Sequence, residues 1–195
     1  QLYEKFGAHE ETVDGVSGIY FAVYAPSAYR VQIIGNFNFW SGDEYNLNVR
    51  WDSSGIWEGF VPELKYGELY KFRIFSNLDS KIREKSDPFG FYFEQPPKTS
   101  SITWDLQFDW TDTKWMKARS RQNTYEQSMS IYEVHIGSWK KNLQEHRSLH
   151  YTELAGIFVD YVRDMGYSHV EFLPLMEHPY YPSWGYLTTG YFAAT

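Results

Sequence analysis

Short runs of alternating apolar and polar residues, separated by turn residues, fill the first 110 positions of the chain. In the clearest run, Tyr70 and Phe72 fall on one face and Lys71 falls on the other, which is the period of two of a half-buried strand. Turn residues recur about every ten positions, which is typical of an antiparallel β-sandwich. A long connection is expected over residues 80–99. The predicted strands are 17–25, 29–34, 55–61, 68–75, 101–104 and 106–110.

The pattern changes after residue 128. Six apolar residues recur at the spacing of one helical face, and Gly166 follows the last of them, where a glycine commonly ends a helix. Predicted strands over 130–136 and 168–173 flank this helix. A strand–helix–strand unit implies parallel strands joined by a right-handed crossover. The helical stripe consists of Leu154, Ile157, Phe158, Tyr161, Val162 and Met165.

These patterns divide the chain into three predicted parts. Residues 1–112 form an all-β, immunoglobulin-like sandwich, residues 113–128 form a polar linker with partial helix as an option, and residues 129–195 hold the β-α-β unit. Two parallel strands need further strands beside them, and a (β/α)8 barrel takes about 250 residues. We therefore expect the last part to be the first β-α-β of a truncated (β/α)8 barrel. The alternative is a complete small α+β domain.

Charge and composition narrow the classes of function. The net charge of −7 opposes binding to a nucleic-acid backbone, which needs a basic face. No apolar run is long enough for a membrane span, and no charged-then-apolar leader opens the chain. Because the chain also has no cysteine, we expect a cytoplasmic protein that contacts neither membranes nor nucleic acid. Aromatic residues make up 20% of the chain, which suits packed cores and flat platforms for sugar rings.

Carboxylates in the β-α-β segment are candidates for acid–base chemistry. Glycoside cleavage uses two matched carboxylates, and this segment offers Glu133 and Glu171 inside strands and Glu177 after the second strand. Charge pairing is the alternative role for each. Histidine and glutamate neighbour each other three times, but neither helical HExxH spacing nor a third ligand accompanies them, so we predict no metal site. No glycine-rich phosphate loop or GxSxG motif is present either.

Aromatic residues also crowd the segment after the second parallel strand, where Pro182, Gly185 and Gly190 interrupt them. Loops that follow parallel strands face the active end of a barrel. This position favours a ligand-binding loop, with core filling as the alternative. The aromatic residues of this loop are Tyr180, Tyr181, Trp184, Tyr186 and Tyr191.

Several ordered segments of the chain resemble 1,4-α-glucan (glycogen) branching enzymes. Residues 130–139 (SIYEVHIGSW), 160–179 and 183–195 resemble the start of the catalytic barrel of that family. The preceding part resembles the carbohydrate-binding module that stands before the barrel. The resemblance covers nearly the whole chain and keeps the order of the segments. The segments of the preceding part are 7–11, 21–40, 55–62, 70–74 and 85–102.

The resemblance implies an early-set carbohydrate-binding sandwich followed by the opening of a catalytic barrel. Enzymes of this family cut an α-1,4-glucan and re-attach the freed chain through an α-1,6 bond by a retaining double displacement. Their essential carboxylates follow later barrel strands, so the resemblance implies no catalytic residue in this chain and no activity for the chain alone. It further implies α-glucan and the remainder of the barrel as partners, and no cofactor.

The resemblance also carries a substrate-contacting pair at the end of the chain. Tyr186 matches the family tyrosine that packs against the sugar at the cleavage point, and Trp184 supports its loop. Leu187 stands where the family commonly has glutamine, which removes a hydrogen-bonding side chain. Ala194 stands at a usual proline, and His150 stands at the usual serine of a helix capping box.

A second pair of candidate residues lies in the sandwich. Trp40 and Lys71 match a tryptophan and a lysine that hold glycogen in the related module of the AMP-activated protein kinase β subunit. Asn36 replaces the acid of the family's turn. Residues 82–85 (IREK) stand where that module's second tryptophan falls, so the resemblance does not imply a sugar held between two indoles. The alternative is a module that mainly packs against the barrel.

Two other functions compete with this interpretation. One is a non-catalytic glucan-binding or scaffold protein, and the other is the N-terminal part of a glycogen debranching hydrolase, which shares the module-plus-barrel plan. The GSW and MEHP segments favour branching. In a truncated barrel, the open sheet edge of residues 129–195 is expected to pack on the sandwich, pair between chains or be poorly ordered.

Overall fold

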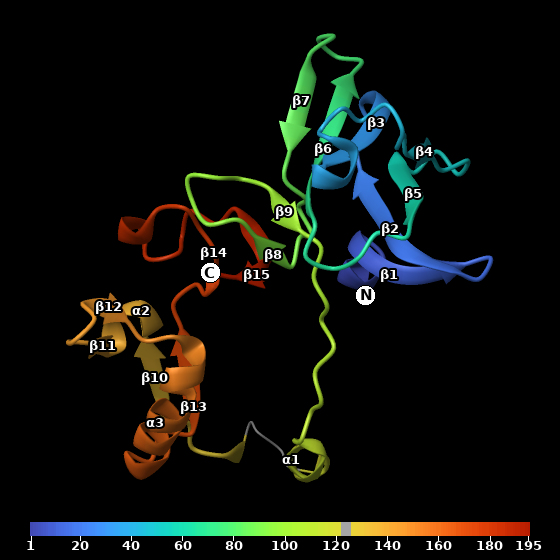
Figure 1. The fold of residues 1–195 in the computed structure, drawn as a ribbon. Helices are drawn as coiled ribbons and strands as arrows, with labels where there is room; N and C mark the ends of the chain where they lie inside the picture. Colours follow the sequence, from blue (N-terminus) through green and yellow to red (C-terminus); the bar gives the residue numbers. More distant parts are fainter. Residues whose placement is uncertain (122–125) are drawn as a thin grey trace. The chain divides into compact units, whose positions relative to one another are not determined.

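The computed structural model describes residues 1–121 and 126–195 (Figure 1). The chain divides into two compact units, one comprising Gln1–Leu106 together with Met176–Thr195, and the other comprising Gln107–Leu175. The predicted linker, residues 113–128, lies partly outside the described residues, and its first half forms α1 (Thr113–Arg119).

The first unit is built on two antiparallel sheets, as the sequence predicted (Figure 1). One sheet has the order β1-β2-β5-β4, and the other has the order β3-β6-β9-β8, with β7 also paired to β6. A short η1 (Leu2–Glu4) precedes the first strand, and η2 (Asn36–Asn38) follows β3. The strand bounds are β1 Gly7–Val13, β2 Val16–Tyr24, β3 Ala28–Gly35, β4 Asn48–Val49, β5 Ile56–Pro62, β6 Leu69–Ser76, β7 Ile82–Lys85, β8 Tyr92–Phe93 and β9 Ser101–Ile102.

The hydrophobic core lies between these sheets. Alternation along β6 places Tyr70 and Phe72 inside, where both are fully buried, and Lys71 on the outer face. Tyr70 and Phe72 each meet the ring of Phe21 edge-on. Full burial of such a side chain contributes about 1.5–3 kcal/mol relative to exposure. The core comprises Ala8, Ile19, Phe21, Val23, Ala25, Val31, Ile33, Leu47, Trp57, Val61, Leu64, Tyr70 and Phe72.

The sequence patterns missed several strands and misplaced one. Strands β7 and β8 lie inside the expected long connection, and residues 106–110 form no strand, so that prediction was wrong. The hairpin of β1 and β2 was also missed, although Asp14 and Gly15 both take positive φ at its turn. Asp-Gly is the signature of such a turn.

Residues 176–195 form a hairpin of β14 (Met176–Glu177) and β15 (Gly190–Ala194), with η4 (Tyr181–Ser183) in its loop. This hairpin packs on the sandwich through β15 and β8 (Figure 1). The Phe192 ring stacks on Phe89 at 4.7 Å between centroids. The predicted boundaries grouped these residues with the barrel segment, and their place in a closed barrel stays a prediction.

The second unit contains the predicted β-α-β motif. Strands β10 (Ile131–Val134) and β13 (His169–Phe172) pair in parallel, and α3 (Tyr151–Asp164) connects them. A short α2 and a two-stranded hairpin lie between β10 and α3. None of the helices within residues 1–121 and 126–195 is long and apolar enough to cross a membrane. The remaining bounds are α2 Ile136–Trp139, β11 Lys141–Asn142 and β12 Arg147–Ser148.

Local interactions fix both ends of α3. At its start, the His150 backbone N–H donates to the Glu153 carboxylate at 2.6 Å, so the glutamate half of the capping box forms without serine. At its end, Gly166 has a φ of 77° and donates to the Arg163 carbonyl, while Tyr167 donates to Val162. This is the Schellman arrangement that the glycine predicted.

Candidate functional site

A tight turn after β3 positions the first candidate residue, Trp40. Phe39 and Trp40 both have positive φ, at 52° and 61°. The buried Asn38 side chain fixes this turn, because it accepts a hydrogen bond from the Gly35 backbone N–H and donates one to the Ile33 carbonyl, at 2.9 and 2.8 Å. Since both bonds are buried, the backbone before Trp40 is held in one conformation.

Two further contacts hold Trp40 against the sheet. Its indole N–H donates to the Asn36 side-chain oxygen at 3.0 Å. Arg73 on β6 donates to the Trp40 and Ser41 carbonyls at 2.9 and 2.6 Å, and it also pairs with Glu84 of β7 at 2.8 Å. The half-buried Trp40 ring is thus anchored to the outer face of the β3–β6 sheet.

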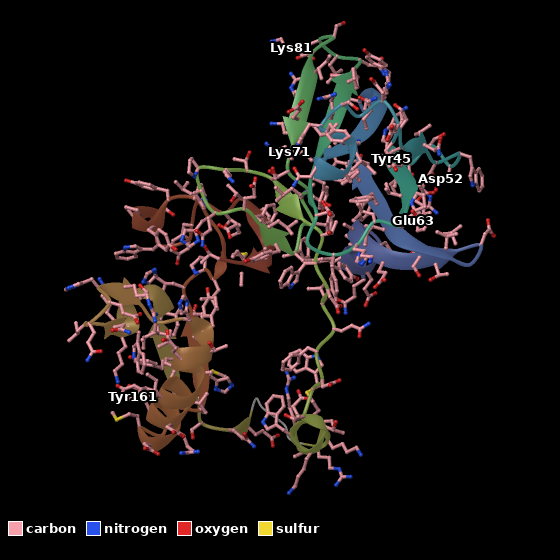
Figure 2. The ribbon with its side chains drawn as sticks, viewed as in Figure 1. Tyr45, Asp52, Glu63, Lys71, Lys81 and Tyr161 are labelled. Atoms are coloured by element: carbon pink, nitrogen blue, oxygen red, sulfur yellow. The ribbon has the colours of Figure 1, made fainter. Side chains whose placement is uncertain are left out.

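Lys71 lies on β6 (Figure 2), two residues before Arg73, and the alternation of the strand puts both side chains on the same sheet face. The Lys71 ammonium donates to the Thr99 hydroxyl at 2.8 Å. Trp40, Arg73 and Lys71 therefore follow one another along this outer face. The alternation of β6 accounts for the shared face of Arg73 and Lys71, but the sequence carried no signal for the contact of Arg73 with the turn.

Thr99 links this face to the C-terminal hairpin, because it lines a cavity of about 110 Å³ together with residues of β14 and its loop. Burial raises the pKa of the Glu177 carboxyl in this cavity. The Glu177 backbone carbonyl accepts the Thr189 N–H at 2.8 Å, which closes the loop over residues 178–189. The cavity is lined by Ser86, Phe93, Glu94, Pro96, Lys98, Thr99, Glu177, Pro179 and Thr189.

The loop that this bond closes carries the second candidate pair. Trp184 ends η4 with a φ of 55°, and the Tyr186 N–H donates to the Ser183 carbonyl at 3.1 Å. Trp184 and Tyr186 are 61% and 66% exposed, so both rings have open surface for a ligand. The turn therefore presents two flat rings within three residues, which is an arrangement suited to stacking on a sugar.

His178 is a buried residue that packs against this loop. It is only 4% exposed, and its ring meets Tyr181 edge-on at 5.5 Å between centroids. Nδ1 lies 2.8 Å from the Met176 carbonyl, whereas Nε2 is buried without a hydrogen-bond partner. Within the described parts of the chain, no three histidine or acidic side chains converge as a metal site would require.

The other candidate carboxylates lie in the second unit. Glu133 on β10 and Glu171 on β13 are register partners, and both are exposed. The opposite face of the strands packs on α3, where the Tyr132 ring contacts Tyr161 at 5.6 Å between centroids. Figure 2 shows Tyr161 on this helix. Glu133 and Glu171 thus stand side by side on the sheet face that α3 leaves uncovered.

Comparisons with known proteins show what the chain is similar to. Residues 5–90 match the family of Carbohydrate-binding module 48 (Isoamylase N-terminal domain). The whole chain is 48% identical to 30% of the 1,4-alpha-glucan branching enzyme GlgB of Albidiferax ferrireducens. It is 47% identical to the enzyme of the same name from Gloeobacter violaceus, of which it spans 27%.

A solved structure supports the fold. A crystal structure of a candidate alpha amylase from Salmonella typhimurium matches 97% of this chain with a TM-score of 0.68 and 19% identity, and the match spans 28% of that protein. The chain is therefore homologous over its whole length to the N-terminal part of 1,4-alpha-glucan branching enzymes, and its sandwich matches carbohydrate-binding module 48.

Proposed function

We propose that this chain is the N-terminal part of a glycogen branching enzyme. The observation that carries the proposal is the 48% identity to a 1,4-alpha-glucan branching enzyme along the entire chain. The parent enzyme cleaves an α-1,4-glucan through a glycosyl-enzyme on a carboxylate, and a sugar hydroxyl then takes the chain to form an α-1,6 branch. The carboxylates for these steps come from the part of the parent outside this sequence.

In this proposal, residues 1–112 form a module that holds α-glucan. Its binding surface is the outer face of the β3–β6 sheet, where Trp40 offers a ring and Lys71 a hydrogen-bond donor. The contacts of Arg73 with the turn support this role, because they fix the indole before a ligand arrives. A preorganised ring loses less conformational entropy on binding.

We further propose that residues 129–195 open the catalytic barrel after the linker over 113–128, and that Tyr186 and Trp184 contact the substrate chain there. Their exposure in the described loop supports this role. Leu187 is also exposed beside them, so it offers an apolar rather than a hydrogen-bonding contact.

Retardation of the chain in glycogen-containing native gels tests the binding role. Trp40→Ala removes the stacking ring and is expected to weaken the apparent affinity about tenfold, a loss of about 1.4 kcal/mol. The matched control is Trp110→Ala, an exposed indole that follows the last strand of the sandwich and belongs to the second compact unit, and it should leave retardation unchanged. Equal retardation of wild type and Trp40→Ala would remove this surface from the proposal.

A branching assay tests the enzymatic part of the proposal separately from the glucan-binding part. Purified chain alone is expected to leave amylose unbranched, because the carboxylates of the parent are missing. The chain joined to the remainder of its barrel should introduce α-1,6 bonds, measured by isoamylase digestion and chain-length profiling of the product. Branching by the chain alone, or its absence in the joined enzyme, would contradict the proposal.

A further inference from the structure

A groove crosses the outer face of the other sheet of the sandwich. Its volume is about 520 Å³, within the range of small-molecule sites. The groove lies on the sheet β1-β2-β5-β4, whereas Trp40 and Lys71 lie on the outer face of the β3–β6 sheet. It is lined by Leu2, Glu4, Lys5, Phe6, His9, Glu11, Tyr20, Ala22, Arg50, Ile56 and Glu58.

Phe6, His9 and Tyr20 give the groove an aromatic floor, and the register of β1, β2 and β5 places Phe60 beside this floor, outside the lining. Tyr20 on β2 lies opposite His9 on β1 and Phe60 on β5, so the three side chains share the outer face. A Cβ built on the neighbouring Gly18 would lie 2.7 Å from the Phe60 ring, which means that this ring covers the glycine. Burial, and after it the neighbouring Glu58 carboxylate, raises the pKa of the Tyr20 hydroxyl, so this carboxylate acts on the ring from beside it.

Charged groups of both signs border this floor. Arg50 lies 3.5 Å from Glu58, and both side chains keep enough exposure to reach a ligand. Glu11 adds a second carboxylate, and the His9 ring is held by the Phe6 carbonyl at 2.9 Å. A guanidinium beside a carboxylate supplies donors and acceptors at one point, which matches adjacent hydroxyl groups.

The charged residues that line the groove indicate which class of ligand it binds. The lining contains Glu4, Glu11 and Glu58 against Lys5 and Arg50. This balance disfavours phosphates and other polyanions, which need a basic site. The floor is also interrupted by hydrogen-bonding groups, so it suits a ligand with one apolar face and hydroxyl groups at its edge.

We propose that this groove is a second binding site for a short α-glucan chain, with a sugar ring on Tyr20 and its hydroxyl groups on Arg50 and Glu58. The identification of the sugar as α-glucan rests on the proposed function. Because the two sites lie on the outer faces of different sheets, one module holds two chain segments of the same glycogen particle. Bivalent attachment of this kind raises the apparent affinity without any new contact.

Titration of the ¹⁵N-labelled chain with maltoheptaose tests the second site without any substitution. Backbone amide signals of Ala22, Ile56 and Glu58 are expected to shift together with those of the Trp40 turn. In Trp40→Ala, the groove signals should still shift. If the groove amides stay unmoved at saturation while the Trp40 turn responds, the second site is absent and the proposed function stands. If only the groove signals shift, the groove site is supported and the Trp40 site is contradicted.

Variants measured by calorimetry give the affinity of each site. In the Trp40→Ala background, Tyr20→Ala and, separately, Arg50→Ala are expected to weaken maltoheptaose binding about tenfold. Tyr24→Ala is the matched control, since Tyr24 lies on the same strand and face, is 60% exposed and lies outside the groove lining. Arg50→Ala keeps the test decisive if Tyr20→Ala does not fold. Binding unaffected by Arg50→Ala in that background would overturn the proposal.

Discussion

Asp87 joins three segments of the sandwich through a fully buried carboxylate. Tyr70 on β6 donates its hydroxyl to one oxygen at 2.7 Å, and the Phe89 N–H donates to the other at 2.8 Å. The Asp87 N–H donates in turn to the Ser101 hydroxyl of β9 at 2.8 Å. Burial raises the pKa of Asp87 to about 6, although the bonds from Tyr70 and Phe89 oppose this shift. The free energy of unfolding is therefore expected to depend on pH through the Asp87 carboxyl.

The sign of this pH dependence follows from how strongly the folded and the unfolded chain bind the Asp87 proton. Between about pH 4 and pH 6 the folded chain keeps the Asp87 proton that the unfolded chain has released, so the stability from this group falls as pH rises. Asp87→Asn removes this dependence. Relative to wild type, the free energy of unfolding of the variant is expected to rise by roughly 1–3 kcal/mol between pH 4 and pH 7. Urea denaturation at both pH values measures it.

Asp43→Asn, an exposed carboxylate of the same sandwich, is the matched control for this series. Its stability relative to wild type should stay constant over the same range of pH. A constant difference for Asp87→Asn as well would show that the buried carboxyl does not titrate in this window.

At the scale of elements, the parallel pair β10 and β13 carries an unfavourable contact. Glu133 and Glu171 occupy directly paired positions on the face that α3 leaves uncovered. Like charges opposite each other in a sheet are destabilising. Glu171→Gln is therefore expected to stabilise the second unit by about 0.2–1 kcal/mol at low salt, measured by urea denaturation. The gain should shrink at high salt, because exposed charges are screened.

Glu145→Gln removes an exposed carboxylate of the same unit that is paired with Arg147, and it serves as the opposite control. It is expected to be neutral or slightly destabilising. A loss of stability in Glu171→Gln at low salt would mean that Glu171 has a favourable partner, and the repulsion would then not govern this strand pair.

Whether an element could be predicted from the sequence depended on the kind of contact that forms it. Strands β2, β3, β5 and β6 were predictable, because each buries alternate residues, and this burial requires apolar residues at every second position. Strands β7 and β8 carry no such pattern, since they pair at an edge over four and two residues. The segment 106–110 alternates and yet forms no strand, because in the described structure no neighbour pairs with it.

The candidate sites show the same difference. Trp40, Lys71, Trp184 and Tyr186 came from resemblance, and their role in binding stays a proposal; the structure shows only that Trp184 and Tyr186 are exposed and that Trp40 and Lys71 are half-buried. The contact of Arg73 with the Trp40 turn depends on strand register. So does the groove around Tyr20, which draws its lining from β1, β2 and β5. Register across strands is set by long-range pairing, and a single sequence does not display it.

At the scale of the whole molecule, each compact unit has an apolar core of its own. In the first unit, Phe72 is fully buried between the two sheets. In the second, Leu154 and Phe158 of α3 are buried, and the Phe158 ring contacts Trp139 and Phe172. Separate cores permit separate unfolding, since cooperativity needs shared contacts.

Two core substitutions test this independence. Phe158→Ala leaves a cavity beside α3 and is expected to cost about 3–5 kcal/mol in the second unit, while Phe72→Ala costs a similar amount in the sandwich. Hydrogen exchange followed by mass spectrometry reads each unit by its own peptides. Phe158→Ala should accelerate exchange in peptides from β10 to β13 and leave β2, β5 and β6 protected, and Phe72→Ala should do the reverse. If either substitution speeds exchange equally in both units, the chain unfolds as one cooperative body, and the two cores then stabilise each other.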